Sequence, residues 1–176
     1  MSHIRLITQG INVAHIYWAL QQHPELWNQN TARTQDPSSP HHELDDIWVR
    51  YGAPDQDPTK PHDAMWHAPA DILGVKSMCL DIMRSVGGSI LGGVLITRIP
   101  PGKTCKPHAD RGWHADVHDK YALQITSAPG QFFCFDNEQL ESKPGDLYSF
   151  ENEHTHWVTN QTPYERITMI VCVRKE

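Results

Sequence analysis

The sequence predicts a mainly β protein, a double-sheet jelly roll supported by helices from its N-terminal half. Two helical patterns occur before residue 88, and the apolar residues of each follow the spacing of one helix face. From residue 89 onward the chain carries about seven short runs of β-branched and aromatic residues with turn residues between them. Helices that precede an all-β segment are typical of a sheet pair with one outer face covered.

The first helix is expected to follow Asn12, whose side chain can cap a helix N-terminus. Its apolar face consists of Val13, Ile16, Tyr17 and Leu20. Pro24 cannot continue the helical hydrogen bonding, so we expect a short turn over Pro24 to Trp27. The second helix is predicted from Ala70 to Val86, before Gly87-Gly88.

A first strand is predicted between the helices, from Asp46 to Tyr51. Strict alternation places Ile47, Val49 and Tyr51 on one face of this strand. The same alternation places Asp46, Trp48 and Arg50 on the other face.

Two polar stretches, residues 28–43 and 52–67, are expected to be irregular, and a third polar stretch follows at residues 111–119. The first contains two prolines and is long for a loop inside a compact domain. We therefore interpret it either as a lid that contacts the substrate or as a simple connector. All three stretches are expected to shape the mouth of the jelly roll, where a functional site would lie.

The strands of the C-terminal half are predicted from their apolar runs and flanking turns. They are expected at residues 89–98, 120–126, 131–135, 147–150, 156–160 and 167–173, with a further extended segment at His108. Pro100-Pro101-Gly102, Asp136-Asn137 and Pro144-Gly145-Asp146 supply turns.

Length and charge limit the classes of protein to which the chain can belong. With 176 residues we expect one domain, in which residues 1–88 give support and the first strand and residues 89–176 form the jelly-roll core. A net charge of −6 argues against a general nucleic-acid binder. Four cysteines without a CxxC pair favour reduced thiols, and no apolar run approaches the roughly 20 residues of a membrane span. We expect a cytoplasmic protein; the sequence does not predict its oligomeric state.

A His-x-Asp motif, His108 and Asp110, is the main candidate for chemistry. Residues two apart on an extended segment project to the same side, so one imidazole and one carboxylate can share a metal ion. His156 is the preferred third ligand, and His154 is the alternative because it lies two residues away. Two histidines and one carboxylate suit Fe(II) with open coordination positions. By itself, however, such a pair is more often a surface feature.

The C-terminal half resembles the cupin-like Fe(II)/2-oxoglutarate-dependent oxygenases, a double-stranded β-helix (jelly-roll) group. The closest similarity is to their aspartyl/asparaginyl β-hydroxylase-like branch. The residues that carry the resemblance are Pro101-Gly102, His108-x-Asp110, Pro144-Gly145-Asp-Leu-Tyr-Ser-Phe-Glu-Asn152, His156-x-Val158-x-Asn160 and Arg166. The match covers roughly residues 89–175 in order and spacing. Some members of the branch lack the carboxylate ligand, whereas this sequence keeps Asp110.

The resemblance implies a role for each matching residue. His108, Asp110 and His156 would hold Fe(II), with 2-oxoglutarate as cosubstrate and O2 as oxidant. Arg166 would pair with the distal carboxylate of 2-oxoglutarate, as a planar guanidinium is suited to do. The remaining residues expected at the cosubstrate are Thr168, on the same strand face as Arg166, then His118 and Lys120 as a basic pair, and Asn160, which would orient His156 or the cosubstrate.

The resemblance implies hydroxylation of an amino-acid, peptidyl or other small-molecule substrate, with release of succinate and CO2. Two alternatives remain open from the sequence. One is a cupin-type metalloenzyme that does not use 2-oxoglutarate, and the other is a non-catalytic cupin-like domain that binds a metal. The first alternative would lack an arginine facing the open side of the metal, and the second would close the metal shell.

Overall fold

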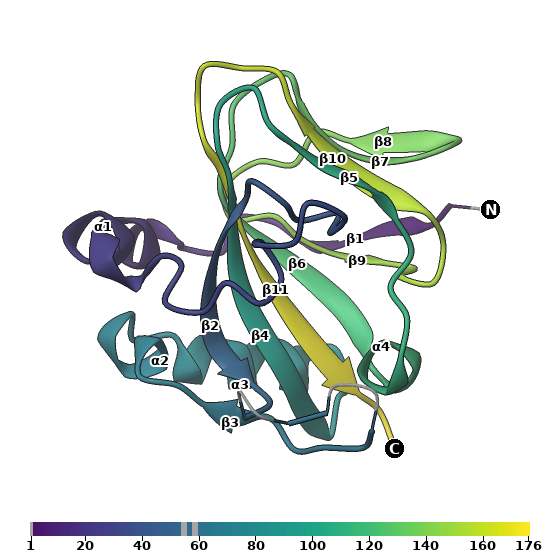
Figure 1. Ribbon diagram of the computed structural model, residues 1–176. Coiled ribbons are helices and arrows are strands. Elements are labelled where there is room, and N and C mark those ends of the chain that lie inside the picture. Colours follow the sequence, from purple (N-terminus) through teal and green to yellow (C-terminus); the bar gives the residue numbers. More distant parts are fainter. Residues whose placement is uncertain (1, 54–55, 58–59) are drawn as a thin grey trace.

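The computed structural model describes residues 2–53, 56–57 and 60–176. Two antiparallel sheets face each other, and the helices α1–α3 cover the outer side of the larger sheet (Figure 1). This confirms the predicted fold class, a mainly β double-stranded β-helix with N-terminal supporting helices. No helix among the described residues is long and apolar enough to cross a membrane.

The larger sheet has seven strands. In spatial order they are β1 (Ile4–Thr8), β9 (Leu147–Phe150), β6 (Asp119–Thr126), β11 (Arg166–Arg174), β4 (Ile90–Ile99), β2 (Asp45–Tyr51) and β3 (Met65–Trp66). The smaller sheet consists of β5 (Thr104–His108), β10 (His156–Asn160), β7 (Gln131–Phe135) and β8 (Glu138–Leu140). The helices are α1 (Ala14–Gln22), a 3₁₀ turn (Pro24–Leu26), α2 (Pro69–Ile72), α3 (Lys76–Ser85) and α4 (Trp113–Val117).

Two apolar clusters hold these layers together. The first lies between the helices and the larger sheet and includes Ile16 of α1, Cys79 of α3 and Met169 of β11. The second lies between the sheets and includes Phe133 and Tyr148. Complete burial of a large apolar side chain contributes about 1.5–3 kcal/mol. The two clusters therefore stabilise the packing on both faces of the larger sheet. All four cysteines are buried and free.

The predicted second helix, Ala70 to Val86, is in fact two helices. Gly74 adopts a φ of +63°, a left-handed conformation that interrupts the helix before α3 begins at Lys76. The first helix starts at Ala14 rather than directly after Asn12, although Asn12 Oδ1 still accepts a hydrogen bond from the Ala14 N–H, 3.1 Å.

Four of the described elements were missing from the prediction. β1 pairs with β9 at the edge of the larger sheet, and β8 pairs with β7 at the edge of the smaller one. β3 lies within the segment predicted as irregular at 52–67, and α4 lies within the segment 111–119. Residues 28–43 contain neither helix nor strand, as predicted.

The predicted face of Tyr51 was wrong. The pairing of β2 with β4 shifts register between Trp48 and Arg50, and this irregularity interrupts the alternation along the strand. Ile47 and Val49 therefore pack toward the helices, whereas Tyr51 lines a cavity between the sheets and contacts Trp48, with ring centroids 4.4 Å apart.

Candidate active site

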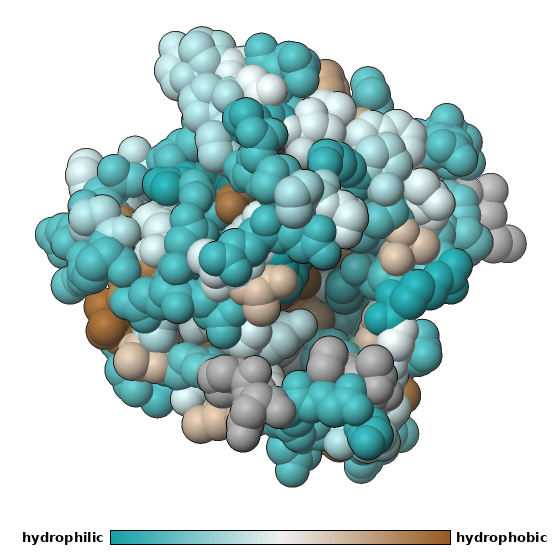
Figure 2. Space-filling view, in the orientation of Figure 1, coloured by the Kyte–Doolittle hydropathy of each residue, from teal (hydrophilic) through white to brown (hydrophobic). Residues whose placement is uncertain are grey.

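A cavity of about 240 Å³ opens between the two sheets. Figure 2 shows a hollow near the middle of one molecular face, bordered mostly by hydrophilic residues. Strands of both sheets, α4 and the segment 28–44 all contribute to its lining.

Strand register brings the two candidate histidines together. His156 of β10 is the direct cross-strand partner of His108 of β5, and their ring centroids are 4.5 Å apart. The Nδ1 of His108 lies 2.8 Å from the carbonyl of Lys106, and the Nδ1 of His156 lies 2.9 Å from the carbonyl of His154. Because a carbonyl only accepts, each Nδ1 carries the proton and each Nε2 keeps a free lone pair.

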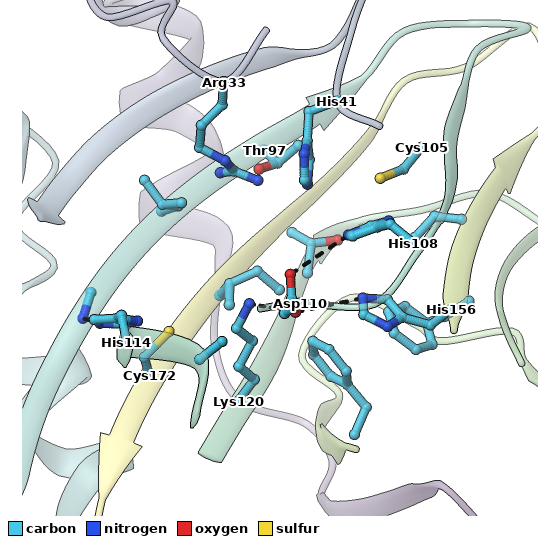
Figure 3. Close-up of a pocket in the computed structure, with 18 of the residues that line it drawn as sticks. Arg33, His41, Thr97, Cys105, His108, Asp110, His114, Lys120, His156 and Cys172 are labelled. Atoms are coloured by element: carbon cyan, nitrogen blue, oxygen red, sulfur yellow. Dashed lines mark hydrogen bonds and ion pairs between the residues drawn. The ribbon is translucent and has the colours of Figure 1, made fainter. Parts of the chain in front are cut away.

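Asp110 completes this cluster from the loop after β5. Its Oδ1 lies 3.7 Å from His108 Nε2 and its Oδ2 lies 3.8 Å from His156 Nε2, and all three ligand atoms lie within 4.8 Å of one another (Figure 3). The backbone N–H of Asp110 donates to the carbonyl of Asn152, 2.8 Å, which ties the loop to the turn between β9 and β10. The His-x-Asp motif and His156 thus place their three potential metal ligands in one cluster.

The protonation states of the cluster favour metal binding. Burial lowers the pKa of His108, and lowers that of His156 to about 4. Burial is the largest single influence on Asp110 and by itself would raise its pKa, but the charge and hydrogen bond of Lys120, together with His156 and His108, outweigh it and the pKa is lowered. Two neutral imidazoles and one carboxylate at neutral pH fit the donor set that Fe(II) takes in oxygenases.

Two other groups of potential ligands fit less well. His41 and Cys105 lie beside His108, but burial raises the pKa of the Cys105 thiol to about 12, so it stays protonated. His154 groups with His3 and Glu151 on the surface and does not line the cavity. The sequence alternative of His154 as third ligand therefore has no geometric support.

Arg166 is a buried cation. Its side chain is only 2% exposed, and among the described residues no carboxylate lies within ion-pair distance. The guanidinium donates to the Thr168 hydroxyl at 2.7 Å, to the Ser142 hydroxyl at 3.2 Å and to the Tyr148 hydroxyl at 3.3 Å. Its Nε is shielded and finds no acceptor in the described part of the chain. A buried charge of this kind is costly unless an anion joins it, so the position fits a ligand carboxylate.

Lys120 faces the cavity from β6, and its Nζ lies 2.5 Å from Asp110 Oδ2. The expectation that His118 shares this position was wrong. His118 precedes β6, donates through Nδ1 to the carbonyl of His114 at 2.9 Å, and is not among the cavity-lining residues. The basic pair therefore reduces to Lys120 alone.

Asn160 also lies away from the cavity, contrary to prediction. It is completely buried at the far end of β10 from His156. Its amide group donates to the carbonyls of Ile99, Pro100 and Tyr164 at 3.1, 3.1 and 2.8 Å. The residue fixes the turns at that end of the sheets, so it orients backbone rather than His156.

The sequence did not predict several residues that line the cavity. Arg33 and His41 reach it from the segment 28–44, which supports the interpretation of that segment as a cover rather than a connector. Arg33 Nη1 lies 3.2 Å from Asp46 Oδ2, and the Thr97 hydroxyl donates to Asp46 Oδ1, 2.7 Å. The signal available was the length of the loop, which does not specify which side chain turns inward.

Comparison with known proteins agrees with this arrangement. The model of the aspartyl/asparaginyl beta-hydroxylase family matches residues 19–176. No curated protein matches the sequence.

Several solved structures share the fold. An oxidoreductase of the 2OG-Fe(II) oxygenase family from Burkholderia pseudomallei has 12% identity and a TM-score of 0.70, over 99% of this chain and 86% of that chain. A prolyl-4-hydroxylase from Pseudomonas putida has 14% identity and a TM-score of 0.58, over 99% and 93%. A prolyl hydroxylase from Trichoplax adhaerens, in complex with a hypoxia inducible factor oxygen degradation domain peptide fragment, has 10% identity and a TM-score of 0.61, over 98% and 84%.

Proposed function

This chain belongs to the aspartyl/asparaginyl β-hydroxylase family and is a 2-oxoglutarate-dependent hydroxylase, and we propose that its substrate is an amino acid, a peptidyl side chain or another small molecule. Fe(II), 2-oxoglutarate and O2 are its cofactor set. Residues 1–176 act as one catalytic unit in this proposal, because the apolar cluster under the larger sheet includes side chains from Val13 to Val173.

His108, Asp110 and His156 hold the iron in this proposal. Their three ligand atoms converge on one side of the cavity, and the rest of the cavity stays open for the cosubstrate and the substrate. When bound, the iron supplies the activation of dioxygen, and the protein contributes positioning and exclusion of water. Backbone carbonyls fix the imidazole tautomers, so the lone pairs are already in place before the metal arrives.

Arg166 takes the distal carboxylate of 2-oxoglutarate. The observation that carries the proposal is that this buried guanidinium lacks any acidic partner in the described part of the chain and lines the same cavity as the donor cluster. Thr168 and Tyr148 orient the guanidinium through their hydroxyls. A metalloenzyme without 2-oxoglutarate would have no need for this cation.

Lys120 holds Asp110 in this arrangement. Its ammonium binds one carboxylate oxygen, which fixes the rotation of the carboxylate and keeps it ionised. His108 and His156 are neutral, so Lys120 supplies the positive charge that balances Asp110.

The experiment that tests this function measures 2-oxoglutarate binding to the protein loaded with Zn(II), which cannot turn over. Arg166→Ala is expected to weaken binding roughly thirty-fold or more, because a charged hydrogen-bonded pair is lost. Arg166→Lys keeps the charge, and its affinity for 2-oxoglutarate is expected to lie between those of the unaltered protein and Arg166→Ala. Arg84→Ala, on the exposed face of α3, is the matched control. Unchanged 2-oxoglutarate affinity in Arg166→Ala would refute the proposal.

A further inference from the structure

His114 carries a hydrogen-bond donor that the arrangement above does not use. The residue lies on α4 and lines the cavity on the side of Lys120 and Cys172 (Figure 3). Its imidazole stacks on His118, with ring centroids 4.2 Å apart and an interplanar angle of 17°, and the ring of His62 lies parallel to it at 6.0 Å. His118 thus covers one face of the His114 imidazole, and the two ring nitrogens lie on the ring edge.

A bulge in β4 fixes the tautomer of this ring. Three residue steps from Leu91 to Val94 face two steps on β11, so the strand carries an extra residue at the glycine pair 92–93. The Gly93 N–H donates to His114 Nε2, 3.0 Å. A backbone N–H only donates, so Nε2 is the acceptor and the proton of the neutral ring is on Nδ1.

Gly92 leaves the room that the two imidazoles occupy. A Cβ on Gly92 would lie 2.6 Å from His118 Cδ2 and 3.0 Å from His114 Nε2. Burial is the main reason that the pKa of His114 is lowered to about 3, so the ring stays neutral at physiological pH. The Nδ1–H has no acceptor among the described residues, and it is not one of the polar atoms shielded from solvent.

The cavity also carries an excess of positive charge. Its lining includes the cations Arg33, Arg111, Lys120 and Arg166. Asp110 balances Lys120, and the buried Asp46 balances Arg33. Fe(II) and the two carboxylates of 2-oxoglutarate cancel each other, so two positive charges remain. Arg111 makes no ion pair within the described residues and lies at the N-terminal side of α4, three residues before His114.

We propose that the His114 Nδ1–H and Arg111 form a subsite for a carboxylate of the substrate. His114 supplies a directed donor, and Arg111 supplies the charge at the mouth. The substrate class is thus a carboxylate-bearing small molecule, in which the group bound at α4 orients the rest of the molecule toward the donor cluster. This inference rests on the proposed function, because the positive charge available to the substrate is the charge that remains after the metal and 2-oxoglutarate are bound.

The test uses NMR on the protein loaded with Zn(II) and an inert 2-oxoglutarate analogue. Calorimetry of that loading step reports on the proposed function by itself, so failure there is distinguishable from failure of the subsite. The probe is acetate, with acetamide as its uncharged match. We expect the His114 ring to be the Nδ1–H tautomer. Acetate should shift its Nδ1–H resonance in a saturable way, and acetamide should bind at least several-fold more weakly than acetate.

Variants separate the two subsite residues. His114→Leu is expected to raise the acetate Kd about ten-fold, which is the loss of one hydrogen bond to a charged group. Arg111→Leu, an exposed position that should not disturb folding, is expected to raise it several-fold. His15→Leu on the exposed side of α1 is the control. An Nε2–H tautomer, an equal response to acetamide, or an unchanged acetate Kd in Arg111→Leu would overturn the proposal.

Discussion

Lys120 Nζ lies 2.5 Å from Asp110 Oδ2, on the carboxylate that also faces Nε2 of His108 and of His156. The lysine comes from the larger sheet, whereas both histidines come from the smaller one. A single ion pair therefore links the two sheets at the donor cluster and determines how the carboxylate is oriented.

The first prediction concerns this ion pair. Lys120→Met removes the group that orients Asp110, and loss of such a partner typically weakens metal binding by about 10–100-fold. Lys120→Arg keeps a charged donor and is expected to recover part of the affinity. Calorimetric titration with Zn(II) measures both. Equal or tighter metal binding by Lys120→Met would show that the ammonium competes with the metal instead of positioning its ligand.

The stability of the metal-free protein should depend on pH through its buried imidazoles. Burial lowers the pKa of His156 to about 4 and that of His114 to about 3, from the ordinary value of 6.5. The unfolded chain takes up these protons near pH 6.5, whereas the folded protein resists them. The contribution of these two imidazoles to the free energy of unfolding is therefore present in full above pH 6.5, and it decreases as the pH falls toward about 4.

Urea unfolding measured between about pH 7 and pH 4.5 tests this prediction. The change of the free energy of unfolding with pH should be smaller in His114→Phe, because the phenyl ring cannot take up a proton. A free energy of unfolding that stays constant over this range would contradict the burial of both neutral rings.

Gly92→Ala is expected to destabilise the fold by about 1–3 kcal/mol, because overpacking forces the imidazole pair away from the strand. The Cβ at Gly93 would lie 3.3 Å from His114 Nε2, which is less crowded, so Gly93→Ala serves as the milder comparison. Thermal unfolding measures both variants. The order of the two effects is the result to check: a larger loss for Gly93→Ala would contradict the stacked arrangement.

Arg33 and Asp46 connect the segment 28–44 to β2, and breaking this pair should be costly. Asp46 is completely buried, so Arg33→Met leaves an uncompensated charge, and such losses are about 3 kcal/mol or more. The double variant Arg33→Met with Asp46→Asn removes both charges and is expected to recover stability. A double-mutant cycle by urea unfolding measures the coupling. Additive effects of the two changes would mean that the ion pair does not anchor the segment.

The donor cluster could be predicted from the sequence because short-range geometry determines it. His108 and Asp110 are two residues apart at the end of a strand, and one further histidine with an arginine ten residues later completed a spacing known from one family. His156 rather than His154 faces the cavity because β10 begins at His156, whereas His154 lies in the preceding turn.

The residues around the cluster could not be predicted in the same way. His118 was expected on the face of Lys120, but the strand begins after it, and α4 turns its ring onto the glycine bulge. Asn160 satisfies backbone carbonyls contributed by a turn that is distant in sequence. Arg33 enters the cavity because of the buried Asp46, a long-range contact that periodicity and spacing do not encode.

The most direct test of the account is anaerobic addition of Fe(II) and 2-oxoglutarate, followed by visible absorption. Bidentate binding of the keto acid to iron gives a weak charge-transfer band, which we expect in the unaltered protein and in His154→Ala. We expect no band in His156→Ala at the same concentrations. A band that survives in His156→Ala, or that is lost in His154→Ala, would contradict the assignment of His108, Asp110 and His156 as the iron site.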